Sequence, residues 1–132
     1  MLSTITIKTT TREEFIDITN EIIKTIKDLK INNGICCIYS PHTTSAITIN
    51  EGADPSVKKD IVNTLKKLIP YSDEYTHLEG NSDSHIKTTL VGPSTTIIID
   101  NGKPLLGTWQ KIFFCEFDGP RTRKIYLKII TG

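Results

Sequence analysis

The first pattern along the chain is an alternation of polar and apolar residues. Residues 3–9 (Ser-Thr-Ile-Thr-Ile-Lys-Thr) follow it and are rich in β-branched side chains, which predicts a half-buried β-strand. The period then lengthens, because apolar residues recur every three or four positions at Phe15, Ile18, Ile22, Ile26 and Leu29. This spacing predicts an amphipathic helix that opens with a capping box at residues 11–14 and ends at Asn33-Gly34.

The middle of the chain predicts two more strands and a second helix. Residues 35–40 are apolar on both faces, as in an interior strand, and residues 46–50 resume a strand pattern after a break at 41–44. Asp54 followed by Pro55 is a typical helix start. This helix should continue to about residue 68 and bury Val57, Ile61, Leu65 and Leu68.

The remainder predicts a short helix followed by three strands. The helix begins with an N-cap at Asn81 or Ser82 and stops at Gly92-Pro93. The strand candidates are residues 94–100, residues 106–118 with a twist or bulge near Gly107, and a last strand that begins at Arg121. Asn101-Gly102 predicts a tight turn after the first of them.

This order of elements is typical of an α+β domain. We expect residues 1–132 to form one compact, sandwich-like domain of mainly antiparallel sheet, in which the closing strands pair antiparallel. Two main helices and a short third helix should pack on one side of the sheet or at its ends.

Composition places the chain among ordinary globular proteins. Hydrophobic residues make up 37% and charged residues 23%, and sixteen basic residues balance fifteen acidic ones. This balance predicts neither a nucleic-acid nor a membrane surface. No apolar run approaches the roughly 20 residues of a membrane span, and residues 1–4 do not resemble a signal peptide, so we expect a cytoplasmic protein. Cys36 and Cys37 are expected to be buried, reduced thiols rather than metal ligands.

The polar stretch at residues 77–87 is the strongest candidate for a functional site. It holds two of the three histidines, His77 and His85, together with two carboxylates, an amide, two hydroxyls and a lysine. A helix that starts at Asn81-Ser82 would present free N–H groups to an anion or a phosphate. The two histidines could meet across a small cavity. The alternative is a well-capped surface turn with incidental histidines.

Other polar residues stand at predicted strand ends. His42 lies between a proline and two threonines, which suits either a functional side chain or one satisfied by its neighbours. Glu116 and Asp118 share one face of their strand, which is costly to bury unless a cation or a metal meets them. Arg121 and Arg123 should point the same way, either as a cross-turn ion pair with Asp118 or as a guanidinium pair for phosphate.

Three groups of residues together resemble the YjbQ family. They are Pro41-His42-Thr43-Thr44 with residues 50–55, the stretch at 77–87, and residues 106–110 with Glu116-Phe117-Asp118-Gly119-Pro120-Arg121. The resemblance covers nearly the whole chain, and Ser45-Ala46 stands where an Ala-Gly type of pair is expected. It implies a compact α+β fold, assembly as a homotrimer with polar residues near subunit boundaries, and a secondary thiamine-phosphate synthase activity that joins the pyrimidine diphosphate and thiazole phosphate halves. The candidate residues that it implies are His42, Glu51, Asp54, His77, Asn81, Asp83, His85, Cys115, Glu116, Asp118 and Arg121.

That reaction displaces pyrophosphate and so requires charge stabilisation, with a divalent cation as an expected cofactor. The expected catalytic residues are His42, His77, His85, Cys115, Glu116 and Asp118. Those expected to bind the phosphorylated substrate are Asn81, Ser82, Lys87, Arg121 and Arg123. Magnesium would be held by Asp83, Glu116 or Asp118, whereas a zinc-like ion would be held by His42, His77, His85 and Asp83. Two alternatives remain open: a metal-dependent hydrolase or hydratase, and a non-catalytic trimer that binds a phosphorylated metabolite.

Overall fold

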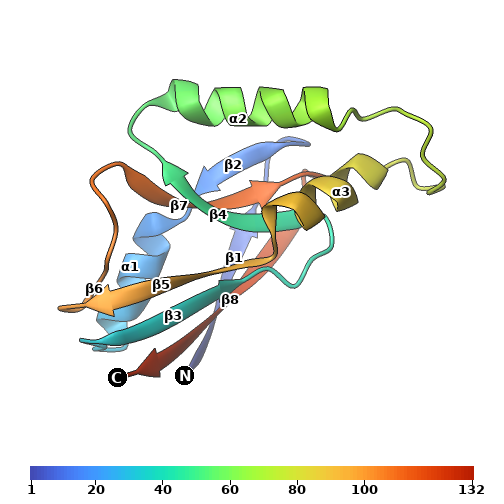
Figure 1. The fold of residues 1–132 in the computed structure, drawn as a ribbon. Helices are drawn as coiled ribbons and strands as arrows, with labels where there is room; N and C mark the ends of the chain where they lie inside the picture. Colours follow the sequence, from blue (N-terminus) through green and yellow to red (C-terminus); the bar gives the residue numbers. More distant parts are fainter.

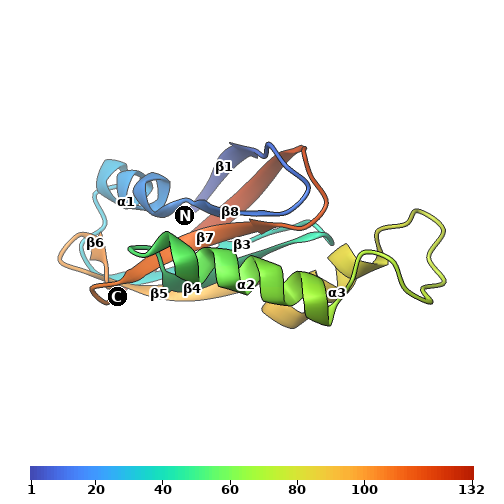
Figure 2. The ribbon, with the colours of Figure 1, turned by 90° about the horizontal axis from the view of Figure 1, so that it is seen from above.

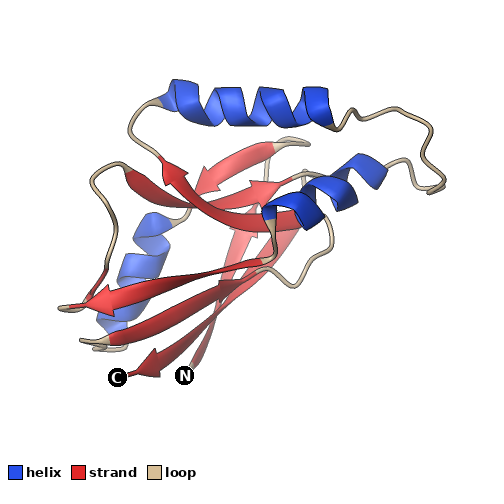
Figure 3. Cartoon of the chain, in the orientation of Figure 1, coloured by secondary structure: helices blue, strands red, loops and turns tan.

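The computed structural model describes residues 1–132 and contains eight strands and three helices (Figures 1 and 3). In chain order they are β1 (Leu2–Lys8), β2 (Glu14–Asp17), α1 (Thr19–Asp28), β3 (Gly34–Tyr39), β4 (Ser45–Glu51), α2 (Pro55–Leu68), α3 (Ser82–Val91), β5 (Ser94–Asp100), β6 (Lys103–Pro104), β7 (Gln110–Glu116) and β8 (Thr122–Thr131). The α+β class and the number of helices are therefore as the sequence predicts. None of the helices is both long enough and apolar enough to cross a bilayer.

The strands form two antiparallel sheets that face each other. One has the order β1-β8-β3-β5-β6 and the other the order β2-β7-β4. Their facing sides bury a single apolar core that also includes the inner side of α1, with Ile22, Ile26, Ile38, Phe114 and Leu127 fully enclosed. The sandwich-like arrangement is confirmed, because every strand except the two-residue β6 places side chains in or against this core.

The predicted helix at the start of the chain is wrong in its first part. Glu14–Asp17 forms strand β2, which pairs with β7, and the helix begins only at Thr19. The physical reason is that Phe15 and the later apolar residues pack in two different apolar clusters. Phe15 packs on the outer side of the three-stranded sheet with Phe113 and Phe117, whereas Ile22 and Ile26 pack between the sheets.

Helix α2 covers the outer side of the three-stranded sheet. Asp54 caps it by accepting a hydrogen bond from the Ser56 N–H at 2.9 Å, as predicted. Ile61 and Leu65 pack on the apolar cluster of that sheet. The predicted burial of Leu68 is wrong, because this last helical residue lies beyond the cluster and is 69% exposed.

The three predicted closing strands, now β5, β7 and β8, are all paired antiparallel, but each pairs with other strands and none of the three pairs with another. The predicted tight turn at Asn101-Gly102 is confirmed, with positive φ values of 51° and 78°, but it joins β5 to the two-residue strand β6 and not to a strand at 106–118. Residues 105–109 then carry the chain to the other sheet, so the predicted strand at 106–118 is shortened to Gln110–Glu116. β8 returns to the five-stranded sheet between β1 and β3.

Helix α3 and the preceding loop stand at one end of the sandwich. Figure 2, a view from above, shows α2 lying across the strands and the loop after it projecting beyond the body of the molecule before α3 begins. The predicted polar stretch at 77–87 spans this loop and the first turns of α3.

Candidate functional site

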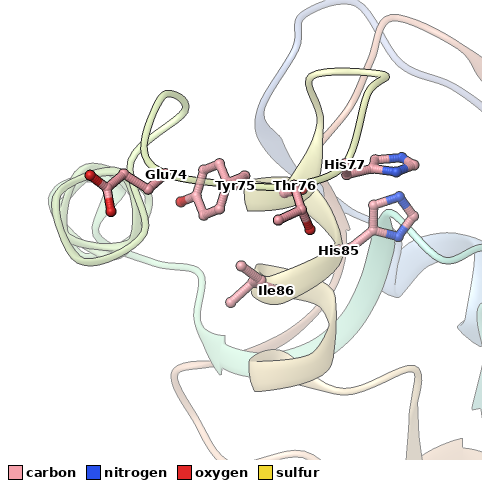
Figure 4. Close-up of a pocket in the computed structure, with 7 residues that line it drawn as sticks. Glu74, Tyr75, Thr76, His77, His85 and Ile86 are labelled. Carbon is pink, nitrogen blue, oxygen red and sulfur yellow. The ribbon is translucent and has the colours of Figure 1, made fainter.

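A cavity of about 560 Å³ lies where the projecting loop meets α3 (Figure 4). Three of its lining residues, His77, Ser82 and His85, were predicted as site residues from the sequence. The remaining lining residues are Glu74, Tyr75, Thr76 and Ile86. Sequence reasoning missed Glu74, Tyr75 and Thr76 because a loop without a regular period gives no indication of which side chains line a cavity. It missed Ile86, in α3, because this apolar side chain suggested no chemistry.

The two histidines of this cavity are in contact. Their ring centroids are 5.4 Å apart and their planes are nearly perpendicular, at 89°. Figure 4 shows both imidazoles side by side and pointing to the same side of α3. His77 Nε2 also lies 3.8 Å from Glu79 Oε2. The cavity therefore combines two proton-transferring or metal-ligating groups with a nearby carboxylate.

The start of α3 is left without a side-chain cap. Asn81 occupies the N-cap position but its Nδ2 donates to Asp118 Oδ2 at 2.8 Å, so its side chain does not accept from the first helical N–H groups. Asp118 is held in turn by Arg121 Nη2 at 2.9 Å. Ser82, the first residue of the helix, lines the cavity. An uncapped helix start favours a negatively charged group beside it.

Beneath the cavity, a buried network of charges fastens α3 to the segment before β2. Arg12 donates to both carboxylate oxygens of Asp83, at 2.9 and 3.0 Å, and Lys87 Nζ donates to Asp83 at 2.9 Å. Lys87 also donates to Glu13 Oε1 at 2.5 Å. Burial alone would raise the pKa of Asp83, but the hydrogen bonds and charges of Arg12 and Lys87 lower it below its ordinary value.

A second buried ion pair joins the two sheets. Glu116 of β7 accepts from Arg123 of β8 on both carboxylate oxygens, with Arg123 Nε 2.9 Å from Oε1. Thr9 Oγ1 donates to the same oxygen at 2.8 Å, and Arg123 Nη2 donates to Thr44 Oγ1 at 2.8 Å. We expected a cation or a metal beside a buried Glu116, and the structure supplies the guanidinium group of Arg123 from the neighbouring sheet.

Several predicted site residues lie outside the cavity. Arg123 and Lys87, expected to bind phosphate, are buried and paired with carboxylates, while Arg121 keeps an exposed side chain. Cys115 is fully enclosed under α2, and burial raises the pKa of its thiol well above the ordinary value. Glu51 and Asp54 hold the start of α2, with the Asp54 N–H donating to Glu51 Oε2 at 3.1 Å.

His42 lies in the loop between β3 and β4 and not among the residues that line the cavity. Its Nε2 is 3.1 Å from the backbone N–H nitrogen of Lys124, which continues β8 past the end of β3. Burial lowers the pKa of His42, and the charge of Arg123 lowers it further. Within one chain, no three His, Cys, Asp or Glu side chains surround a common point. Of the predicted ligands His42, His77, His85 and Asp83, only His77 and His85 line the cavity, while Asp83 is paired with Arg12 and Lys87.

Comparison with known proteins gives matches along the whole fold. A family model described as UPF0047 protein YjbQ-like matches residues 3–132. The UPF0047 protein MJ1081 of Methanocaldococcus jannaschii is 64% identical over 98% of this chain and 94% of its own length. The UPF0047 protein YugU of Bacillus subtilis is 50% identical over 98% and 99%.

Solved structures agree with this relationship. An uncharacterized conserved protein of the YjbQ/UPF0047 family from Clostridium acetobutylicum superposes with a TM-score of 0.95 at 50% identity, covering 97% of this chain and 99% of its own. The hypothetical protein APE1520 from Aeropyrum pernix K1 also gives a TM-score of 0.95, at 33% identity, covering 100% and 99%.

Proposed function

The chain belongs to the YjbQ-like UPF0047 family, and we propose that it is a small-molecule enzyme whose active site is the cavity at the start of α3. The observation that carries this proposal is the contact between His77 and His85 in a cavity of about 560 Å³. Two imidazoles that face the same space can act as a general acid and a general base on one bound molecule. A cavity of this size is sufficient for a small metabolite.

The expected ligand carries a phosphate or pyrophosphate group. The uncapped start of α3 supplies backbone N–H groups and the positive end of the helix dipole, and Ser82 adds a hydroxyl. Arg121 is the one predicted phosphate-binding cation with an accessible guanidinium group, since its side chain is 52% exposed. Because Arg121 and Asn81 both bind Asp118, this arginine is part of the same hydrogen-bond network as the first residues of α3.

The reaction that we propose is a slow thiamine-phosphate synthesis. The thiazole nitrogen forms a bond to the methylene carbon of the pyrimidine half, and the C–O bond to pyrophosphate breaks with its electron pair leaving on pyrophosphate. Negative charge therefore grows on the departing group, which the start of α3 can stabilise. His85 lies in the first turn of that helix, and in this proposal it donates a proton to the departing group.

The proposal is tested by assaying thiamine phosphate formation from the two phosphorylated halves with added magnesium. We expect slow turnover by the wild-type protein and at least about 100-fold less by His85→Ala, as is typical when a general acid is removed. Thr89→Ala is the matched control, because Thr89 is an exposed residue of the same helix. Equal turnover by a folded His85→Ala variant would remove His85 from the mechanism.

A non-catalytic binder is the second candidate, and the uncapped helix start is the observation that favours it. Such a protein would gain thermal stability with pyrophosphate, would lose that gain in Arg121→Ala, and would form no product from the two halves. The same preparations therefore distinguish the two functions.

We also propose that the protein assembles as a homotrimer. The outer side of the five-stranded sheet supports this, since it leaves five large apolar side chains exposed: Leu2, Ile35, Tyr39, Ile98 and Ile130. An exposed apolar sheet face of this kind is typical of a protein interface.

A further inference from the structure

We propose that Arg12 is a positioning residue of the active site, because its guanidinium group holds both walls of the cavity in place. The projecting loop, residues 70–80, forms one wall through residues 74–77, and α3 forms the other. His77 of the loop meets His85 of the helix only while loop and helix keep their relative position. The catalytic meaning of this role rests on the proposed function, whereas the position of the loop can be measured without any reaction.

On one side, Arg12 binds the first turn of α3. Its Nη1 and Nη2 atoms donate to the two carboxylate oxygens of Asp83 at 3.0 and 2.9 Å, and Nη2 also donates to Ser84 Oγ at 3.2 Å. Ser84 Oγ donates in turn to the backbone carbonyl of Phe117 at 2.5 Å. A two-pronged guanidinium–carboxylate pair fixes orientation as well as distance. Arg12 is therefore fixed relative to the helical turn that carries His85.

On the other side, the same guanidinium group lies over the ring of Tyr71 in the projecting loop. Arg12 Cζ is 4.1 Å from the centroid of that ring. Because a guanidinium group is planar, its face can stack on an aromatic ring while its N–H groups bind a carboxylate. Lys87 also binds Asp83, but its second partner is Glu13, which precedes β2. Of the two cations that bind Asp83, Arg12 is the one that also stacks on the loop.

The projecting loop has few other attachments to the body of the protein. The hydrogen bonds of residues 70–80 all stay within the loop, and the one that spans the most residues joins the Tyr75 hydroxyl to the Pro70 carbonyl at 2.6 Å. None of its residues belongs to either apolar cluster. A segment with so few packed and hydrogen-bonded contacts opens at a low cost in free energy. The stack on Arg12 therefore determines how closely His77 approaches His85.

The test is the nuclear Overhauser effect between the ring protons of His77 and His85, measured by NMR in ligand-free protein labelled at histidine. The wild type should show it, because the two ring centroids are 5.4 Å apart. Tyr71→Leu removes the ring beneath Arg12 and should lose the signal, whereas the matched Tyr71→Phe keeps the ring and should retain it. Arg12→Lys keeps the charge but not the planar group, and it should also lose the signal.

Turnover in the thiamine phosphate assay should fall at least about tenfold in Tyr71→Leu, because a displaced catalytic group slows the reaction steeply. Leu78→Ala is the control, since Leu78 is a fully exposed residue of the same loop, and it should keep both the signal and the turnover. Tyr71 is 58% exposed, so Tyr71→Leu should keep the wild-type circular dichroism and melting temperature.

The NMR signal and the turnover separate this role from the proposed reaction. A signal that persists in both Tyr71→Leu and Arg12→Lys, or that is absent from the wild type, would overturn the positioning role. If turnover fell in Tyr71→Leu while the signal stayed, the positioning role would fail and the proposed function would stand. Loss of the signal in both variants, with no thiamine phosphate made by the wild type, would support the positioning role and contradict the reaction.

Discussion

Lys87 and Asp83 lie one turn apart on α3, with Lys87 Nζ 2.9 Å from Asp83 Oδ2 and side chains only 1% and 0% exposed. His85 stands midway between them in the sequence. Since each helical residue is rotated by about 100° from the one before, the two buried charges and His85 point to opposite sides of α3. The ion pair therefore fastens the inner side of the helix while the outer side presents the histidine to the cavity.

The first prediction concerns this buried pair. Lys87→Met should lower the free energy of unfolding by about 3 kcal/mol or more, because it leaves the carboxylates of Glu13 and Asp83 with less compensation in a buried place. Urea denaturation measures the change. Lys24→Met is the control, since Lys24 and Asp28 form an exposed i,i+4 pair, and it should give no measurable difference. A Lys87→Met variant as stable as the wild type would show that the network is not needed for folding.

The second prediction concerns acid stability. The folded protein lowers the pKa of Asp83, so the unfolded chain binds this proton more readily than the folded one. The stabilisation is fully present above the unfolded aspartate pKa of about 3.9 and is lost as the pH falls through the lower folded value. Thermal unfolding between pH 6 and pH 2.5 should show a steeper acid loss for the wild type than for Asp83→Asn. Parallel curves would contradict the assigned role of this carboxylate.

The third prediction concerns His42. Its pKa is lowered in the folded protein, so the stability that it contributes is present above about pH 6.5 and is lost as the pH falls below that value. An NMR titration should show His42 remaining neutral at pH values where a free histidine is already protonated. Its neutral Nε2 should stay an acceptor for the Lys124 N–H. Titration of His42 at or above the free value would contradict this.

Local patterns were sufficient for most elements of the fold. Asp54-Pro55 begins α2 and Asn101-Gly102 turns the β5–β6 hairpin, because both depend on neighbouring residues only. Glu14 shows the limit of such reasoning. Its carboxylate accepts from the N–H groups of Thr10 and Thr11 at 2.6 and 2.8 Å, whereas the capping box predicted the start of a helix. Pairing with β7, which is about a hundred residues away, determines the outcome, and no local pattern reports it.

The candidate site was also predictable only in part, where the relevant residues are close together in the sequence. The density of polar residues at 77–87 was visible in the sequence, and the structure brings His77 and His85 of this stretch together. The partners of Lys87 and Arg123 were not visible, because Glu13 lies 74 residues from Lys87 in the sequence and Glu116 lies on the other sheet. A sequence does not distinguish a basic residue that pairs with a buried carboxylate from one that binds a phosphate.

The fourth prediction concerns the outer side of the five-stranded sheet. Ile98 and Ile130 are 56% and 64% exposed there, and burial between subunits would favour association by the hydrophobic effect. We expect a trimer by light scattering for the wild type and smaller species for Ile98→Glu combined with Ile130→Glu. Ile23→Glu, a change at an exposed isoleucine of α1, is the control and should leave the mass unchanged. A wild-type monomer at micromolar concentration would contradict the proposed assembly.

The most direct test of the central claim is the turnover number for thiamine phosphate formation in His77→Ala, His85→Ala and the double variant. If the two imidazoles act on one substrate as a unit, each single change should lower turnover about 100-fold and the double change only slightly more. Turnover in both folded single variants equal to that of the wild type would show that the chemistry does not occur at this pair.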